Sequence, residues 1–285
     1  MLNMVEGIES HDEELFGCQV TTVDIQTEQA ADLLGRTVGQ YITIESPGLL
    51  HKGMEITEVG ECLAAVLDRV LRPHYQGKLC ICGMGNRNVP ADSLGPEVTY
   101  ALPLKAFSKF NVGGNFRDVC SFAPGTDGTN NIDTEIIMGG IVRAADADCV
   151  LLVDSSITND VSRLFRTIQL SASGGVDSYW YGRKRKWSVL GVPVVSLCVP
   201  TTIPLSNLCP EKEQGDINLT DMMVQEVIDA ASIIISYAIL RVCWPSLSKK
   251  ECFVYAKLNR DQIPYSTLFG SGTDSDNEDN ICNKT

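Results

Sequence analysis

The sequence predicts an α/β fold with a doubly wound, mostly parallel sheet and helices on both faces. Continuous apolar runs, such as KLCICGMG at 78–85 and CVLLV at 149–153, are typical of buried parallel strands. Segments with apolar residues at helical spacing, such as 56–73, separate these runs. Strand, helix and strand in turn indicate this fold class, in which ligands bind beyond the carboxyl ends of the strands.

In chain order, β-branched runs at 20–25 and 40–46 predict two strands. The segment 27–35 between them predicts a helix that ends at Gly35, and the helix that starts at Ile56 should end before Pro73. The later segments continue the alternation, with strands at 78–85, 149–156 and 192–200 and helices from Asp92 or Ser93, at 132–145, at 162–170 and at 219–244.

Length and composition predict one folded domain with a tail at each end. The chain has 285 residues, 44% of them hydrophobic, which suffices for a sizeable core. We assign residues 19–247 to a single α/β domain. Residues 1–18 are polar and acidic without periodicity and predict a flexible leader, and residues 248–285 form a C-terminal extension whose acidic end has too few apolar residues to fold.

The charge of the chain excludes some partners. A net charge of −13 opposes nucleic-acid binding, which requires a basic surface, and suits a basic protein substrate better. Since the chain has no apolar stretch of membrane-spanning length and no apolar signal core, we expect no membrane partner and a cytoplasmic location.

Cysteine and histidine positions predict neither disulfides nor a metal site. Several of the eleven cysteines lie inside apolar runs, where a thiol behaves as a small hydrophobic group, namely Cys80, Cys82, Cys149 and Cys198. The three histidines are scattered and lack a second ligand at helical spacing. The glycines at 83–85 match neither nucleotide-binding pattern, so we expect no cofactor.

Two aspartates follow predicted strands and are candidate catalytic residues. Asp92 lies just after the loop that leaves strand 78–85, and Asp154 ends the run LLVD. At one sheet crevice, two carboxyl groups would differ in pKa and provide both an acid and a base. The alternative is that each aspartate only caps the helix that follows it.

One dense basic cluster, GRKRKW at 182–187, stands out in this acidic chain. Its central residues are Arg183, Lys184 and Arg185. They form either a solvated loop or a site for acidic side chains of a substrate or of a partner subunit.

Taken together, the motifs resemble the germination protease family, the spore endopeptidases that degrade small acid-soluble spore proteins. Their order and spacing agree over roughly residues 20–245. The resemblance rests on YITIESPGL (41–49), GMGNRNVPADSLGP (83–96), SFAPGTDGTNNIDTEIIMGGIV (121–142), LLVDSS (151–156), RTIQLS (166–171) and RKRK with LGVPVVSLCVPTTI (183–203).

The resemblance implies an atypical aspartic-type endopeptidase whose essential aspartates correspond to Asp92 and Asp154. Asn86 and Asn88 would orient Asp92 or bind the substrate backbone. The family fold is similar to that of the hydrogenase-maturation peptidases. The resemblance also implies a homotetramer in the spore core or forespore and a zymogen, so that leader 1–18, with ELFG at 14–17, is a possible propeptide.

The sequence departs from the family pattern in the segment SASGGVDSYWYG at 171–182. This departure leaves open a non-catalytic paralogue that binds a peptide or protein partner. A nickel-sensing maturation peptidase is disfavoured, since the histidine ligand is missing.

Overall fold

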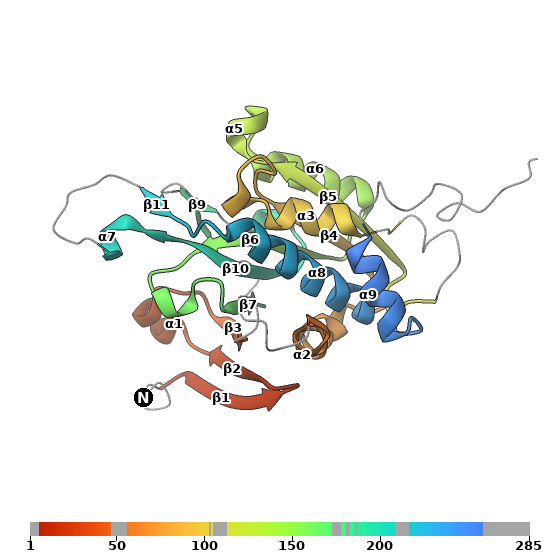
Figure 1. Ribbon diagram of the computed structural model, residues 1–285, viewed down its shortest axis with the longest axis horizontal. Helices are drawn as coiled ribbons and strands as arrows, with labels where there is room; N and C mark the ends of the chain where they lie inside the picture. Colours follow the sequence, from red (N-terminus) through yellow and green to blue (C-terminus); the bar gives the residue numbers. More distant parts are fainter. Residues whose placement is uncertain are drawn as a thin grey trace, which may run out of the picture.

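The computed structural model describes residues 6–46, 56–102, 104, 113–172, 178–180, 183–185, 187–208 and 217–258. Within them, a nine-stranded sheet crosses the centre of the molecule (Figure 1). Its strands, in spatial order, are β1 (Ile8–Leu15), β2 (Cys18–Ile25), β3 (Gly39–Glu45), β7 (Thr167–Ser171), β10 (Val194–Pro204), β6 (Cys149–Ile157), β4 (Lys78–Met84) and β5 (Asp118–Gly125), with β11 (Asn218–Leu219) paired to β10.

The sheet confirms the predicted α/β class. Strands β5, β4, β6 and β10 are parallel neighbours. The predicted apolar runs form β4, β6 and β10, whereas the half-buried edge strand β5 was not predicted. Beyond β10 the sheet continues through β7, β3, β2 and β1, which pair antiparallel. The carboxyl ends of β4 and β6 are therefore adjacent, as the predicted strand-end site requires.

Helices cover both faces of the sheet. On one face, α8 (Val224–Cys243) contacts α2 (Ile56–Leu71), α3 (Leu94–Ala101) and α9 (Lys249–Lys257) (Figure 1). On the other face, α6 (Thr134–Ala145) packs with the 3-10 helix η5 (Trp187–Leu190). A further helix, α1 (Glu28–Leu34), packs its buried alanines against Ile8 and Ile25.

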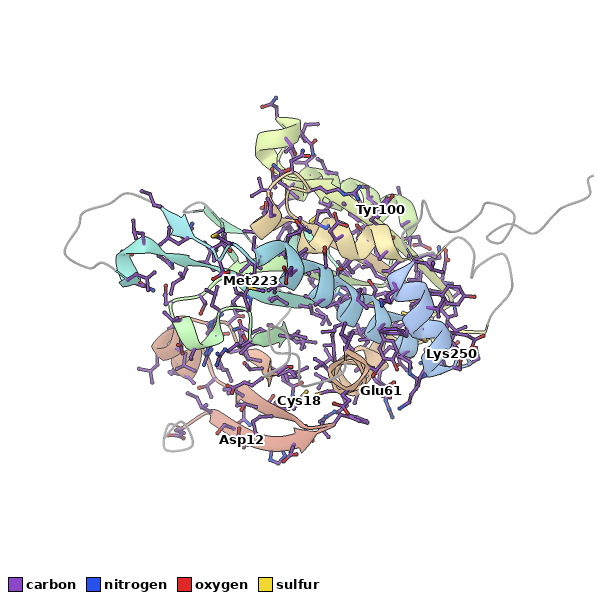
Figure 2. All side chains as sticks on the ribbon, viewed as in Figure 1. Asp12, Cys18, Glu61, Tyr100, Met223 and Lys250 are labelled. Atoms are coloured by element: carbon purple, nitrogen blue, oxygen red, sulfur yellow. The ribbon has the colours of Figure 1, made fainter. Side chains whose placement is uncertain are left out.

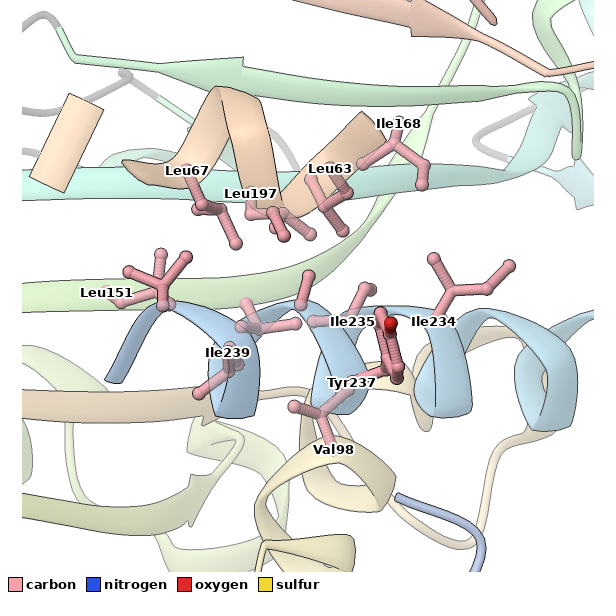
Figure 3. Close-up of a cluster of buried hydrophobic side chains, with 14 of the residues drawn as sticks. Leu63, Leu67, Val98, Leu151, Ile168, Leu197, Ile234, Ile235, Tyr237 and Ile239 are labelled. Carbon is pink, nitrogen blue, oxygen red and sulfur yellow. The ribbon is translucent and has the colours of Figure 1, made fainter. Parts of the chain in front are cut away.

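Strand residues alternate between the two cores. In β4, Leu79 and Ile81 belong to the α8 core, whereas Cys80 and Cys82 belong to the α6 core. Figure 3 shows the α8 core, where Ile235 and Ile239 of the helix lie among strand and helix side chains. This alternation of period two explains why both residue sets of each central strand are apolar.

The prediction of a helix at 162–170 is wrong. The segment contains the 3-10 helix η4 (Val161–Arg163) and then strand β7, which lies between β3 and β10. Phe165 separates them with a left-handed backbone, φ 60°, and donates its N–H to the Pro200 carbonyl. Ladder hydrogen bonds on both sides of β7 outweigh the helical spacing of its apolar residues.

The predicted flexible leader is also corrected over the residues that the structure describes. Residues 8–15 form β1, an edge strand that pairs with β2 along its whole length. Its side chains are mostly polar because one edge and part of one face meet solvent, while Ile8 is buried. Residues 1–5 lie outside the described part, and the propeptide stays a prediction.

The C-terminal extension begins as packed structure. Helix α9 starts with a capping box in which Ser248 and Glu251 bond reciprocally, and it buries Cys252 and Ala256 against the α8 core. The folded unit therefore continues past the predicted boundary at residue 247. The predicted disordered acidic end lies outside the described residues.

All the cysteines that the structure describes are free thiols, including the core cysteines predicted to be reduced, Cys80, Cys82, Cys149 and Cys198. No described helix has the length and the apolar character needed to span a bilayer. In the same part of the chain, no three or more His, Cys, Asp or Glu side chains are grouped so as to hold a metal ion.

Candidate active site

The loop that follows β4 folds back on itself and fixes Asp92. The backbone N–H of Asn86 donates to the Asp92 carbonyl oxygen and to its Oδ2, each at 2.9 Å. Asn86 Oδ1 accepts from the N–H of Asn88 at 3.0 Å, which tightens the turn. The 3-10 helix η3 (Pro90–Asp92) then leads into α3. The loop is thus held by its own backbone and by side chains of the motif.

Close backbone contacts place this loop against β6. A Cβ added to Gly95 would lie 2.3 Å from the Met84 carbonyl oxygen and 2.5 Å from that of Val153, the residue before Asp154. At Gly85, φ is +120° and an added Cβ would lie 2.0 Å from the Asp92 carbonyl oxygen. Only glycine fits these two positions, so they allow the Asp92 turn to lie beside the end of β6.

Asp92 is a buried carboxyl group with one satisfied oxygen. The residue is 7% exposed, and Oδ2 accepts from the backbone N–H of Asn86. Oδ1 is buried and has no hydrogen-bond partner among the described residues. Burial raises the pKa of Asp92 to about 7, although the hydrogen bond from Asn86 acts in the opposite direction. Asp92 can therefore give or take a proton near neutral pH.

The raised pKa makes stability depend on pH. From about pH 4 to pH 7 the unfolded chain ionises this carboxyl group while the native protein keeps the proton, so the native protein loses free energy of unfolding as the pH rises. We expect Asp92→Asn to abolish this loss. Its stability advantage over the wild type should grow by about 2 to 3 kcal/mol between pH 5 and pH 8.

Urea unfolding at several pH values measures this difference. Asp229→Asn is the control, because Asp229 is exposed on α8 and accepts a hydrogen bond from Gln225. An advantage of Asp92→Asn that stays constant with pH would show that the carboxyl group does not titrate in this range.

Asp154 lies in β6, three residues before the end of the strand. It is half-buried, and its Oδ1 accepts from the N–H of Ser155 at 2.8 Å. It pairs in register with Cys198 of β10. Burial, reinforced by the nearby charge of Asp154, raises the pKa of Cys198 to about 11 and that of Cys82 well above the usual range. Strand alternation places the Asp154 side chain on the α6 face.

Neither aspartate caps the following helix, the alternative role that its sequence position suggested. Asp92 directs Oδ2 back to Asn86, and the N-cap of α3 is Ser93, which makes no side-chain cap bond. Asp154 is a strand residue, and the next helical turn, η4, is capped by Asp160. The carboxyl groups of both aspartates are therefore not used for helix capping.

A pocket of about 380 Å³ adjoins the Asp92 loop. Asn86 and Asn88 line it, while neither aspartate is among its lining residues. The role of the two asparagines in substrate binding stays a prediction. Sequence reasoning missed Arg87 and Tyr100, which also line it. The guanidinium of Arg87 lies 4.2 Å from the ring centre of Tyr100, which Figure 2 labels on α3. Arg87 also bonds Glu97 at 2.9 Å.

A third missed residue is Thr201 of β10. Its hydroxyl donates to the Ala91 carbonyl at 2.7 Å and so ties η3 to the sheet. The sequence signal was the pair of threonines directly after an apolar strand, which is weak by itself.

The predicted basic cluster forms a separate small element. Arg183, Lys184 and Arg185 make up β9, which pairs antiparallel with β8 (Ser178–Trp180) in a two-stranded sheet apart from the main one. Among the described residues, this cluster is thus not joined to the main sheet, which carries Asp154. Its role in binding acidic groups stays a prediction.

The strand order and the acidic side chains near the ends of β4 and β6 define the class of protein: an α/β protein with its candidate site at the carboxyl edge of the parallel strands. The chain belongs to the germination protease family, whose profile matches residues 2–212. The predicted family is thereby confirmed.

Curated relatives agree with this assignment. The germination protease of Caldanaerobacter subterraneus subsp. tengcongensis is 32% identical over 207 residues, which are 70% of this chain and 64% of that protein. The germination protease of Bacillus subtilis is 32% identical over 211 residues, 70% of this chain and 57% of that protein. The chain thus spans less than two thirds of the length of these relatives.

Among solved structures, the [NiFe] hydrogenase maturation protease HycI from Thermococcus kodakarensis is similar, with a TM-score of 0.37 and 16% sequence identity. The similarity covers 61% of this chain and 98% of that one. The fold assignment of this chain rests on its own strand order and helices.

Proposed function

We propose that this chain is an aspartic-type endopeptidase that hydrolyses peptide bonds of small acid-soluble spore proteins during spore germination. Membership of the germination protease family supports a peptidase with a role in spores. The observation that carries the aspartic mechanism is Asp92, a buried carboxyl group with a pKa of about 7 at the carboxyl edge of the parallel strands.

The two aspartates would divide the proton transfers. As the base, Asp154 takes a proton from a water molecule, and the water oxygen attacks the carbonyl carbon of the scissile peptide bond. Asp92, protonated at neutral pH, gives its proton to the leaving nitrogen as the C–N bond breaks. The products are a carboxylic acid and an amine, and the proton taken up by Asp154 later restores Asp92. The raised pKa of Asp92 suits it to the acid role.

The pocket beside the loop suits a segment of the substrate. Asn86 and Asn88 offer amide groups that can bond a peptide backbone, and they lie on the same loop as Asp92. The basic residues Arg183, Lys184 and Arg185 would bind acidic side chains of the substrate or of a partner subunit. We further propose that the protein acts as a homotetramer in the spore core or forespore and that its N-terminal residues are a propeptide.

Incubation of the purified protein with a small acid-soluble spore protein tests this function. We expect internal cleavage, with new termini identified by mass spectrometry, and no cleavage by Asp92→Asn. Binding of the spore protein without any cleavage would contradict the proposal and would identify a non-catalytic member of the family.

A further inference from the structure

Ser155 has a buried hydroxyl whose role the fold does not explain. The residue is 4% exposed, and its Oγ has no hydrogen-bond partner among the described residues. A buried polar atom without a partner costs free energy, so it is retained where it has another use. Alanine would fill the same place in β6 without this cost.

The hydroxyl lies on the face of the sheet where η3 packs. Cys149, Leu151 and Val153 of β6 are all in the α8 core, so strand alternation directs Ser155 to that side. Its register partner, Val199 of β10, is in the same core. Ser155 therefore points away from Asp154 and toward the α8 side.

The turn that carries Asp92 is tied to the same place. η3 contacts β6, β10 and α8. The hydroxyl of Thr201, two residues beyond Val199 on β10, holds the carbonyl oxygen of Ala91, the neighbour of Asp92. Ser155 and Asp92 thus approach one buried region, and each brings to it an oxygen that no described residue bonds, Oγ of Ser155 and Oδ1 of Asp92.

We propose that Ser155 is a positioning residue whose hydroxyl binds, together with Oδ1 of Asp92, one water molecule that fixes the Asp92 carboxyl group for proton transfer. The inference rests on the proposed function for its catalytic meaning. A water molecule can link the two groups, because neither oxygen bonds a described residue and each can bond water. The hydroxyl can donate to this water while the water donates to the carboxylate.

The titration of Asp92 tests the proposal without any need for activity. Protein labelled with carbon-13 at the aspartate carboxyl groups, with the Asp92 signal assigned from Asp92→Asn, gives the midpoint directly. We expect Ser155→Ala to raise the titration midpoint of Asp92 by roughly 0.5 to 1 pH unit, because the ionised carboxylate loses a stabilising hydrogen bond. Ser155→Thr keeps a hydroxyl and should titrate like the wild type.

Ser236→Ala is the matched control. Ser236 is also buried with a hydroxyl that no described residue bonds, but it lies on α8. Its replacement should leave the Asp92 midpoint unchanged. In a cleavage assay, Ser155→Ala should lower kcat about five- to tenfold with KM nearly constant, the effect of one hydrogen bond lost in positioning.

An Asp92 midpoint that Ser155→Ala leaves unchanged would overturn the proposal, even if the variant lost activity. A chain that cleaves no peptide would instead refute the proposed function, and the titration would still decide whether Ser155 and Asp92 are linked. A thermal unfolding curve for each variant confirms that the comparison is made between folded proteins.

Discussion

Asp92→Asn and Asp154→Asn are each expected to lower kcat for peptide hydrolysis by about a thousandfold or more. Removal of a general acid or base commonly costs two to four orders of magnitude in rate, and an amide can neither give nor take the proton at neutral pH. Asn86 can still donate to the amide oxygen of an asparagine at position 92, so the loop should keep its geometry. The loss would therefore come from chemistry rather than from folding.

Initial rates on a spore protein substrate, with the exposed Asp229→Asn as control, measure this effect. The expected pH dependence of stability makes this test more specific, because Asp92→Asn should be more stable than the wild type at neutral pH and yet inactive. A residue that costs stability and supports activity is expected at a functional site. If either aspartate variant kept a tenth of the wild-type rate, that residue would not be a catalytic group.

Gly95→Ala is expected to destabilise the fold by at least about 3 kcal/mol. The added methyl group would lie 2.3 to 2.5 Å from backbone atoms of Met84 and Val153, which belong to two central strands. Backbone cannot move aside as the end of a flexible side chain can, so α3 would have to shift away from β4 and β6. The Asp92 turn, which directly precedes α3, would move with it.

Gly140→Ala is the control for this variant. Gly140 lies in α6, is exposed, and an added Cβ would meet nothing within 4 Å. Since alanine favours helix, this change should stabilise by up to about 1 kcal/mol. Chemical denaturation of both variants checks the prediction, and equal stabilities would show that the contact at Gly95 is not tight in solution.

The central strands were predictable from sequence because their signal is local. Strands buried on both faces must be apolar throughout, so β4, β6 and β10 appear as continuous runs with clear ends. The helix that ends at Gly35 was equally clear, since Gly35 adopts the left-handed C-cap conformation, φ 60°. From these elements the sequence predicts a candidate site at the edge of the sheet where the carboxyl ends of β4 and β6 are adjacent.

The antiparallel half of the sheet depends on contacts remote in sequence. β7 was predicted as a helix because its few residues suit either structure, and only its pairing with β3 and β10 decides between them. β1 was predicted as a flexible leader because an edge strand can be almost wholly polar. No local pattern distinguishes such a strand from an unfolded segment.

Some features of the candidate site were likewise predictable from the sequence, and others depend on packing. The loop motif marked Asp92 as unusual, but its burial and raised pKa follow from packing that no sequence pattern reveals. In the sequence, nothing distinguishes Ser155 from the adjacent Ser156. Only the structure shows that the Ser155 hydroxyl is buried on the α8 side of the sheet and bonds no described residue. The role of Thr201 likewise becomes visible only in the structure, where its hydroxyl donates a hydrogen bond to the Ala91 carbonyl oxygen.

The claim that Asp92 is the proton donor is tested most directly by the pH dependence of kcat/KM for peptide cleavage. Because Asp92 must carry its proton to act, kcat/KM should fall as the pH rises, with a midpoint near the pKa of about 7 that burial gives this group. A value of kcat/KM that stays constant or rises from pH 6 to pH 9 would contradict the claim.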